Sequence, residues 1–157
     1  MLSADFIKAQ LALQAYRDAA QDGLNGMLAV CFVVRARVRA GWQGSDWLQV
    51  LSHHREYAAV NTPPQFELPD PRNYAFGLLL QEIDGIFSGT REDDILTPSA
   101  ATMGPIVTFD NQPAKPVALY YGNLSDPNLR PWFLESISRA TDRHSMVATV
   151  GSLTFFS

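Results

Sequence analysis

Cysteine, basic charge and long apolar runs are scarce in this sequence. Its one cysteine, Cys31, cannot form a disulfide bond within the chain, and its apolar neighbours predict a small buried core residue. The formal net charge of −4 argues against nucleic-acid binding, because proteins that bind nucleic acid normally carry a basic face. No apolar run approaches the about 20 residues that span a membrane. The N-terminal MLSADFIKAQ is too polar for a signal peptide, so we expect a chain made in the cytoplasm without a membrane span.

Motifs for several chemistries are missing as well. His53, His54 and His144 lack the spacing of a metal site, and no second cluster of Cys or His supports them. Phosphate-binding loops, nucleophile elbows and dinucleotide-binding glycine patterns are absent. The sequence therefore predicts no metal site. The tryptophans leave two alternatives open, since they can be core residues or can line a sugar cleft: Trp42, Trp47 and Trp132.

The overall composition is that of an ordinary globular protein. Hydrophobic residues make up 46% and charged residues 18% of the 157 residues, a length that suits one core and leaves little for a second. We therefore expect a single domain over residues 1–157.

The most apolar stretch of the chain predicts its central helix. From Met27 the apolar positions cover almost the whole circumference, and later turns narrow to a stripe bordered by arginines (Arg35, Arg37 and Arg39). A helix that is apolar nearly all round is buried, so residues 27–40, ending at Gly41, should form the core helix. A helix over about 5–20 with Ser3 as N-cap should precede it, broken from it at Gly23 and Gly26.

Helices and then hairpins are predicted for the remainder. Ser45 is expected to cap a short helix over 46–52, and Asp70 a helix over about 71–87 that ends by Gly89 and buries one stripe: Tyr74, Leu78, Ile83 and Phe87 or their near neighbours. Runs 106–110 and 116–121 predict a hairpin, and Pro131 opens a short helix. A second hairpin, 146–150 with 153–156, has Gly151-Ser152 as a two-residue type II′ turn. Helices followed by hairpins give an α+β fold class.

One acidic pair suggests a chemistry. Asp18 and Asp22 are four residues apart, so they share a face if the helix continues to Asp22. Two carboxyl groups in a cleft are the usual apparatus of glycoside cleavage, where one donates a proton to the leaving oxygen. The alternative is that both are capping or solvated residues at a helix end.

The order of motifs resembles a known family. YRDAAQDGLNGMLAVCFVVRARV resembles the start of the SleB-type cell-wall hydrolase domain, found in spore-cortex-lytic enzymes and phage proteins. Asp18 and Asp22 fall on the two glutamates of the family's acidic stretch, and several residues match: Gly26, Ala29-Val30 and Arg37-Val38. Glu56 and Tyr57 fall on the Gln-Phe of a later motif. Three further segments are similar to family motifs: Ala118-Leu119-Tyr120-Tyr121 with Asn123, Pro131-Trp132, and 150–156.

The resemblance implies a lysozyme-like α+β fold, with N-terminal helices around a buried core helix and β-hairpins at the C-terminal end. It implies a lytic transglycosylase or muramidase that acts on peptidoglycan glycan strands without metal or organic cofactor. Asp18 would be the catalytic acid, and the substrate-binding residues would be Asp22, Glu56, Tyr57, Tyr120, Tyr121 and Asn123.

Departures from the family pattern leave a second function open. Asp18 is one methylene shorter than the family's Glu, Leu119 and Leu153 replace histidines, and Ala58 replaces a serine. A productive site tolerates displacements of about 0.5 Å, less than one methylene. The chain is thus either a glycan-cleaving enzyme or a catalytically inactive SleB-like fold, used as a structural or binding component among other phage structural proteins. Without a signal peptide, both readings favour a phage origin, with delivery by holin release or packaging in the virion.

Overall fold

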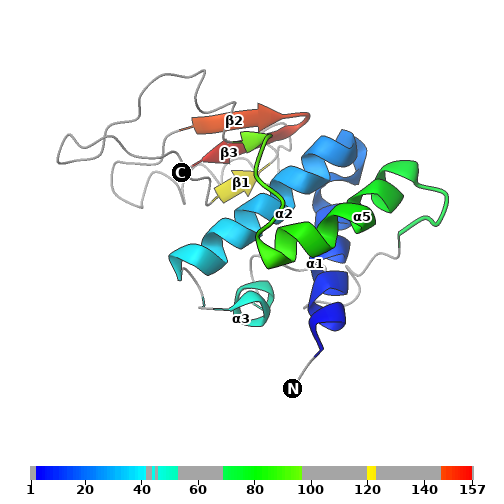
Figure 1. The fold of residues 1–157 in the computed structure, drawn as a ribbon. Helices are drawn as coiled ribbons and strands as arrows, with labels where there is room; N and C mark the ends of the chain where they lie inside the picture. The colour runs from blue at the N-terminus through cyan, green and yellow to red at the C-terminus, as the bar shows by residue number, and fades with distance from the viewer. Residues whose placement is uncertain are drawn as a thin grey trace. The chain divides into compact units, whose positions relative to one another are not determined.

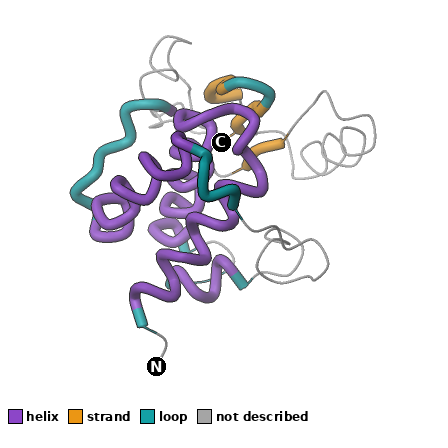
Figure 2. The backbone as a smooth tube through the Cα atoms, turned by 90° about the vertical axis from the view of Figure 1, so that its right-hand side faces the viewer, coloured by secondary structure: helices purple, strands orange, loops and turns teal. Residues whose placement is uncertain are grey.

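The computed structural model describes residues 3–41, 44, 46–52, 69–96, 120–122 and 146–156. Two compact units divide the chain, Met1–Glu92 and Asp93–Ser157, and each is described by itself. The first unit contains helices, and the second contains the strands (Figure 1). Helices make up most of the described chain (Figure 2).

Helix α1, Ala4–Ala19, opens the first unit. The predicted N-cap is confirmed, because Ser3 Oγ accepts a hydrogen bond of 3.3 Å from the backbone N–H of Phe6. This bond satisfies one of the backbone donors that a helix start leaves open. The buried face of α1 is made of small and aliphatic residues together with one amide: Leu11, Ala12, Gln14, Ala15 and Ala19.

Helix α2, Gly23–Ala40, is the most buried of the described helices, as its all-round apolar pattern predicted. Every residue from Gly26 to Arg35 is buried, and α2 lies against α1, α3 and α5. It ends as predicted at Gly41, which adopts a left-handed conformation with φ of 67°. The helix starts four residues earlier than expected, however, so Gly26 lies inside it and does not break it.

Two arginines of α2 are buried against expectation. Arg35 is 6% exposed and Arg37 is 2% exposed, although both were predicted to border the apolar stripe. Arg37 follows Val30 by seven residues, two helical turns, and therefore lies on the same buried face. Each arginine takes part in interactions within the protein, so neither charge is buried without a partner.

Arg35 ties the core helix to the turn that follows α5. Its Nη1 donates a hydrogen bond of 2.5 Å to the backbone carbonyl of Arg91, and its guanidinium lies 4.8 Å from the centre of the Phe32 ring. Arg91 approaches the same ring at 5.6 Å and donates from Nε to Glu82 at 2.9 Å. Two cations therefore lie near one aromatic ring, and each also donates a hydrogen bond, Arg35 to a carbonyl and Arg91 to a carboxylate.

The caps of α3 and α5 differ from the predicted ones. Helix α3, Trp47–Leu51, is capped by Asp46, whose carboxylate accepts from Gln49 N–H at 2.9 Å. Ser45, the expected cap, lies outside the described residues. Helix α5, Tyr74–Ser88, is capped by Asn73, which accepts from Phe76 N–H at 3.0 Å. Asp70 was predicted as the cap, but its carboxylate accepts from Arg72 N–H and closes a turn one residue before Asn73.

The buried face of α5 is rotated from the predicted one. Its core residues are Leu79, Ile83 and Ile86, whereas Tyr74 is 80% exposed. Tyr74 precedes Leu79 by five residues, a separation that puts it well away from the buried stripe. The helix ends as predicted at Gly89, whose φ is 86°.

A three-stranded antiparallel sheet lies in the second unit, with strand order β1-β3-β2. Strands β2, Met146–Val150, and β3, Leu153–Phe156, confirm the predicted hairpin, and Gly151 has the positive φ of 57° that its tight turn needs. Strand β1, Tyr120–Gly122, pairs with β3, so that Tyr121 lies opposite Phe155. The predicted hairpin of 106–110 with 116–121 and the helix opened by Pro131 fall almost wholly outside the described residues.

Helices in one unit and an antiparallel sheet in the other confirm the α+β class. In the part of the chain that the structure describes, none of the helices combines the length and apolar content that crossing a bilayer demands.

Candidate functional site

Asp18 lies on the last turn of α1, directly before the chain changes direction. The carboxylate is half-buried, and its Oδ2 accepts a hydrogen bond of 2.6 Å from Gln14 Nε2. The two residues are four apart on one helix, the spacing at which side chains on a helix meet. A second amide, Gln21 Nε2, donates to the backbone carbonyl of Asp18 at 3.3 Å. The carboxyl group is therefore held by its own helix, and it makes at least one further interaction.

Gln14 is the partner that the sequence analysis missed. It is 1% exposed, between Leu11 and Ala15, which are fully buried. Its Oε1 has no hydrogen-bond partner, the one such buried side-chain atom among the described residues. A buried polar group without a partner costs about 1–3 kcal/mol. The spacing of four residues to Asp18, on an otherwise apolar face, was the signal that could have identified Gln14.

The break after Asp18 depends on two glycines in different ways. A short 3-10 helix, η1 (Ala20–Asp22), links α1 to α2, and Gly23 then adopts φ of 71° with ψ of −162°, a conformation essentially restricted to glycine. Gly26 serves a close approach, because a Cβ added there would lie 2.5 Å from the Cβ of Asp22. The missing side chain of Gly26 thus lets α2 begin directly against η1.

Asp22 does not continue the face of Asp18 in a regular α-helix. The 3-10 segment intervenes, so the condition for a shared face is not met. Asp22 occupies the N-cap position of α2, but its carboxylate makes no capping hydrogen bond there. Its side chain is half-buried and takes part in another interaction within the protein. Helix capping, one of the two readings left open, therefore does not account for Asp22.

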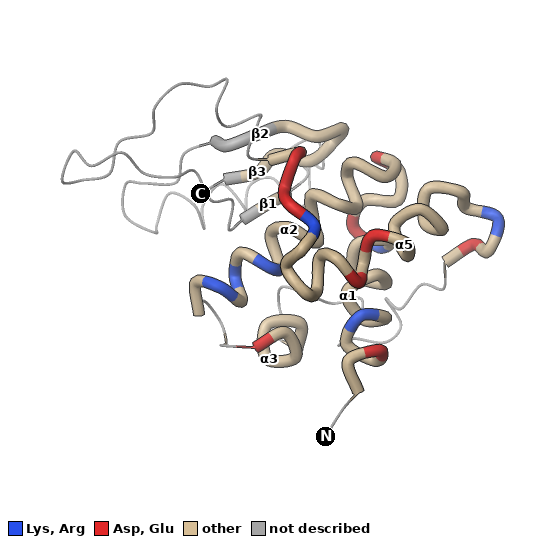
Figure 3. Tube along the Cα trace, in the orientation of Figure 1, with Lys and Arg blue, Asp and Glu red and all other residues tan. Residues whose placement is uncertain are grey.

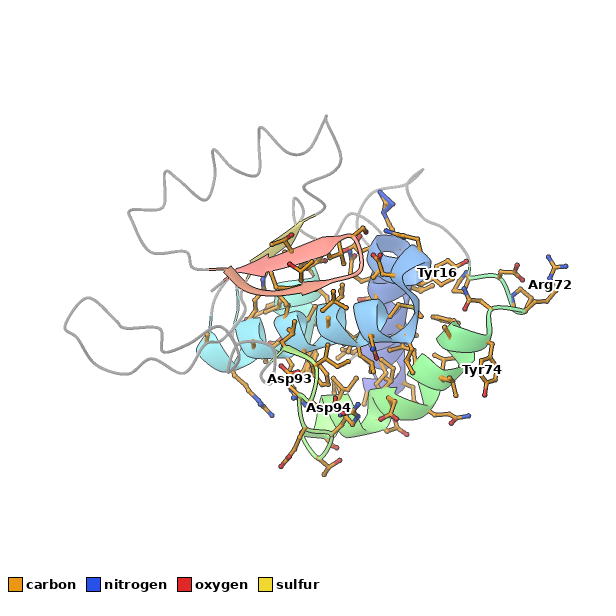
Figure 4. The ribbon with its side chains drawn as sticks, turned by 90° about the horizontal axis from the view of Figure 1, so that it is seen from above. Tyr16, Arg72, Tyr74, Asp93 and Asp94 are labelled. Atoms are coloured by element: carbon orange, nitrogen blue, oxygen red, sulfur yellow. The ribbon has the colours of Figure 1, made fainter. Side chains whose placement is uncertain are left out.

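Tyr16 fixes the segment before α5 to the end of α1. Its hydroxyl accepts a hydrogen bond of 3.2 Å from Asp70 N–H, and its ring meets Phe76 edge-on at 5.3 Å. Hydrogen bonds from the backbone N–H and then the guanidinium of Arg72 lower the pKa of Asp70. Tyr16 lies beside this segment, whereas Arg72 and Tyr74 point away from the helices (Figure 4). The end of α1 is thus held by contacts with α5 and the segment before it.

The other predicted substrate-binding residues are not brought to Asp18 by what the structure describes. Glu56, Tyr57 and Asn123 lie outside the described residues. Tyr120 and Tyr121 belong to β1 of the second unit, where the Tyr121 ring stacks on Phe155 at 5.8 Å. The groove that these residues were expected to share with Asp18 stays a prediction.

Charge is distributed unevenly along the core helix. The first half of α2 carries no charged residue, and its three arginines follow in the second half (Figure 3). The last turns of a helix favour cations, because the backbone carbonyls there carry partial negative charge. Asp18 and Asp22 therefore lie at the end of α2 that is free of arginine.

Metal and aromatic candidates add little to the site. Within the described ranges no three side chains of His, Cys, Asp or Glu come together as a metal site would require, and the three histidines lie outside those ranges. Trp47 is half-buried and packs on Phe87 at 5.3 Å, which favours the core alternative for this tryptophan. Trp42 and Trp132 lie outside the described residues.

Comparison of the chain with protein-family models finds no match. Comparisons with curated proteins and with solved structures also find no match.

Proposed function

We propose that this chain is a divergent SleB-type cell-wall hydrolase with a lysozyme-like fold, which cleaves peptidoglycan glycan strands as a muramidase or lytic transglycosylase. The proposal rests on the sequence motifs and on one structural observation. Asp18 is a half-buried carboxylate, hydrogen-bonded by a buried amide, on the last turn of a helix before a glycine-dependent break. A rigidly supported carboxyl group at such a break is suited to proton transfer.

In this proposal Asp18 acts first as an acid and then as a base. The protonated carboxyl donates its proton to the glycosidic oxygen, which leaves with the bond electrons. The carboxylate so formed then accepts a proton from the hydroxyl group or water that attacks the anomeric carbon. The resemblance assigns sugar binding to a set of polar and aromatic residues and implies no metal or organic cofactor: Asp22, Glu56, Tyr57, Tyr120, Tyr121 and Asn123.

A second function is favoured by Leu153. The family has a histidine at this position, whereas Leu153 is 3% exposed and belongs to the apolar side of β3 together with Phe155. A buried leucine can neither transfer a proton nor bind a sugar hydroxyl. The alternative is therefore a catalytically inactive SleB-like fold, used as a structural or binding part of a phage virion. In either case the protein is delivered by holin release or inside the particle.

Two substitutions of Asp18 distinguish these functions. If the shorter acid is only misplaced, Asp18→Glu raises the rate of glycan cleavage and Asp18→Asn abolishes it. Turbidity of a peptidoglycan suspension would be followed, with mass spectrometry of the products to separate a muramidase from a transglycosylase. Asp5→Asn is the matched control, since it makes the same chemical change at the exposed start of α1. Cleavage that survives Asp18→Asn excludes Asp18 from the mechanism. No cleavage by wild type or Asp18→Glu contradicts the enzymatic proposal and favours the virion component.

A further inference from the structure

Gln14 has no counterpart among the motifs that led to Asp18, yet it is the side chain that holds the Asp18 carboxyl group. We propose that Gln14 is a positioning residue, which fixes the Asp18 carboxyl and favours its ionised form. The catalytic meaning of this inference rests on the proposed function of Asp18. The hydrogen bond itself does not, because it joins two described side chains.

Burial gives Gln14 the rigidity that positioning needs. Its side chain is 1% exposed and lies on the buried face of α1, where Leu11 and Ala15 have no exposed surface. Close packing restricts such a side chain to few rotamers, so the place of Nε2 is set by the core. Because Gln14 Nε2 is fixed by the packing around it, its hydrogen bond of 2.6 Å to Asp18 Oδ2 also fixes the position of the carboxylate.

The amide also biases the protonation state of Asp18. When Nε2 donates to the carboxylate, the ionised form is stabilised and one carbonyl oxygen, Oε1, is left without a partner among the described residues. A rotation of the amide by half a turn would let Oε1 accept from the protonated acid. That orientation would bury an NH₂ group away from Asp18, and buried N–H groups without partners are rarer than carbonyls in that state. The donating orientation, and with it the carboxylate, is thus the more favourable one.

Other charges near this end of α1 have to be separated from the effect of Gln14. Arg17 of α1 directly precedes Asp18 in the chain and Asp22 of η1 follows it by four residues. Asp70 and Arg72 lie in the segment that Tyr16 holds. Helix α2 carries no charged residue before Arg35, and α3 has none. Helix α5 contributes Glu82, which pairs with Arg91, and Asp84, which pairs with Lys8. Asp18 has a further interaction besides Gln14, so removal of Gln14 is expected to shift its titration in part.

The test is an NMR titration of the Asp18 carboxyl carbon in the full chain. Loss of the donor in Gln14→Leu should raise the pKa of Asp18 by about one unit, since a hydrogen bond to a charged group is worth that much or more. Gln21→Leu is the matched control, because Gln21 donates only to the backbone carbonyl of Asp18 and should leave the titration unchanged. If Gln14→Leu cleaves glycan, the alkaline limb of its pH–rate profile should lie at higher pH than that of wild type by the same amount, because Asp18 must be protonated to act as the acid.

A measurement on the wild type covers the case in which Gln14→Leu does not fold. The side-chain ¹⁵N resonance of Gln14 should titrate with the midpoint of the Asp18 carboxyl carbon, while that of Gln21 should shift less. Absence of this common midpoint overturns the proposal, as does an unchanged Asp18 titration in a folded Gln14→Leu. If no form of the protein cleaves glycan but both titrations behave as expected, the hydrolase function fails and the role of Gln14 toward Asp18 stands.

Discussion

Replacement of Gly23 by alanine isolates the energy of the backbone conformation that follows Asp18. Gly23 has φ of 71° and ψ of −162°, and a Cβ added there meets no atom within 4 Å. The substitution therefore tests conformation without a steric clash. Backbone strain of this type costs about 1–3 kcal/mol. The reduced entropy of the unfolded chain returns about 0.4–1 kcal/mol. We expect Gly23→Ala to lower the free energy of unfolding by about 1–2 kcal/mol.

Gly77 provides a matched control for this substitution. It lies exposed inside α5, and a Cβ added there also meets nothing within 4 Å. Because its conformation is helical, Gly77→Ala should raise the stability by about 0.5–1 kcal/mol. Urea unfolding followed by circular dichroism would compare the two variants with wild type at constant m-value. Equal effects of the two substitutions, or a neutral Gly23→Ala, would refute the assignment of strain to Gly23.

Three further outcomes are expected. Gly26→Ala should destabilise the protein by about 1–3 kcal/mol in urea unfolding, because its Cβ would meet the Cβ of Asp22 at 2.5 Å; a neutral result would contradict the close approach of α2 to η1. Asn73→Ala should cost about 1 kcal/mol as the loss of an N-cap, and Asp70→Ala should cost less in the same assay; the reverse order would restore Asp70 as the cap. Burial raises the pKa of Cys31, an effect that Arg35 offsets in part, so the thiol should react with a neutral disulfide reagent only on unfolding. Its pKa is higher in the folded than in the unfolded chain, so its contribution to stability should be lost as pH rises above about 8.5; the Cys31→Ala variant should lack this alkaline loss, and rapid native labelling would disprove the burial.

The sequence predicted a helix end correctly where a single residue type determines where the helix begins or ends. Ser3, Gly41 and Gly89 act as their residue types predict, because side-chain capping and left-handed conformations are local properties. Asp70 and Asn73 show the limit of predicting caps from residue type, since Asp and Asn are both favoured N-caps and both side chains accept a backbone hydrogen bond here. The structure shows that Asn73 makes the capping hydrogen bond of α5.

Burial was predictable for the continuous apolar run of α2 and less so elsewhere. Tyr74 was expected on the buried stripe of its helix, but the buried residues of α5 are Leu79, Ile83 and Ile86. Arg37 was expected at the border of the stripe, yet it follows Val30 by two helical turns and therefore lies on the same buried face. Burying a charged side chain costs free energy, but the position of a residue on a packed helix determines whether its Cβ faces the core.

Of the candidate site, the sequence identified Asp18 and the break after it, but not what holds the carboxyl group. Gln14 was visible only as a polar residue on an apolar face, and its bond to Asp18 depends on the rotamer that the core imposes. Gly26 was interpreted as a break, whereas its missing side chain makes room for Asp22. A glycine that bends a chain and one that permits close packing look the same in a single sequence.

During synthesis on a ribosome, the two units can complete their pairings at different times. Helices α1, α2 and α5 contact one another within Met1–Glu92, so they can pack as soon as α5 has emerged. The sheet has to wait, because β1 and β2 both pair with β3, which is made after them. Until β3 is made, the backbone N–H and C=O groups of β1 lack their partner strand and can pair with strands of other nascent chains. Its length of only three residues keeps that edge short.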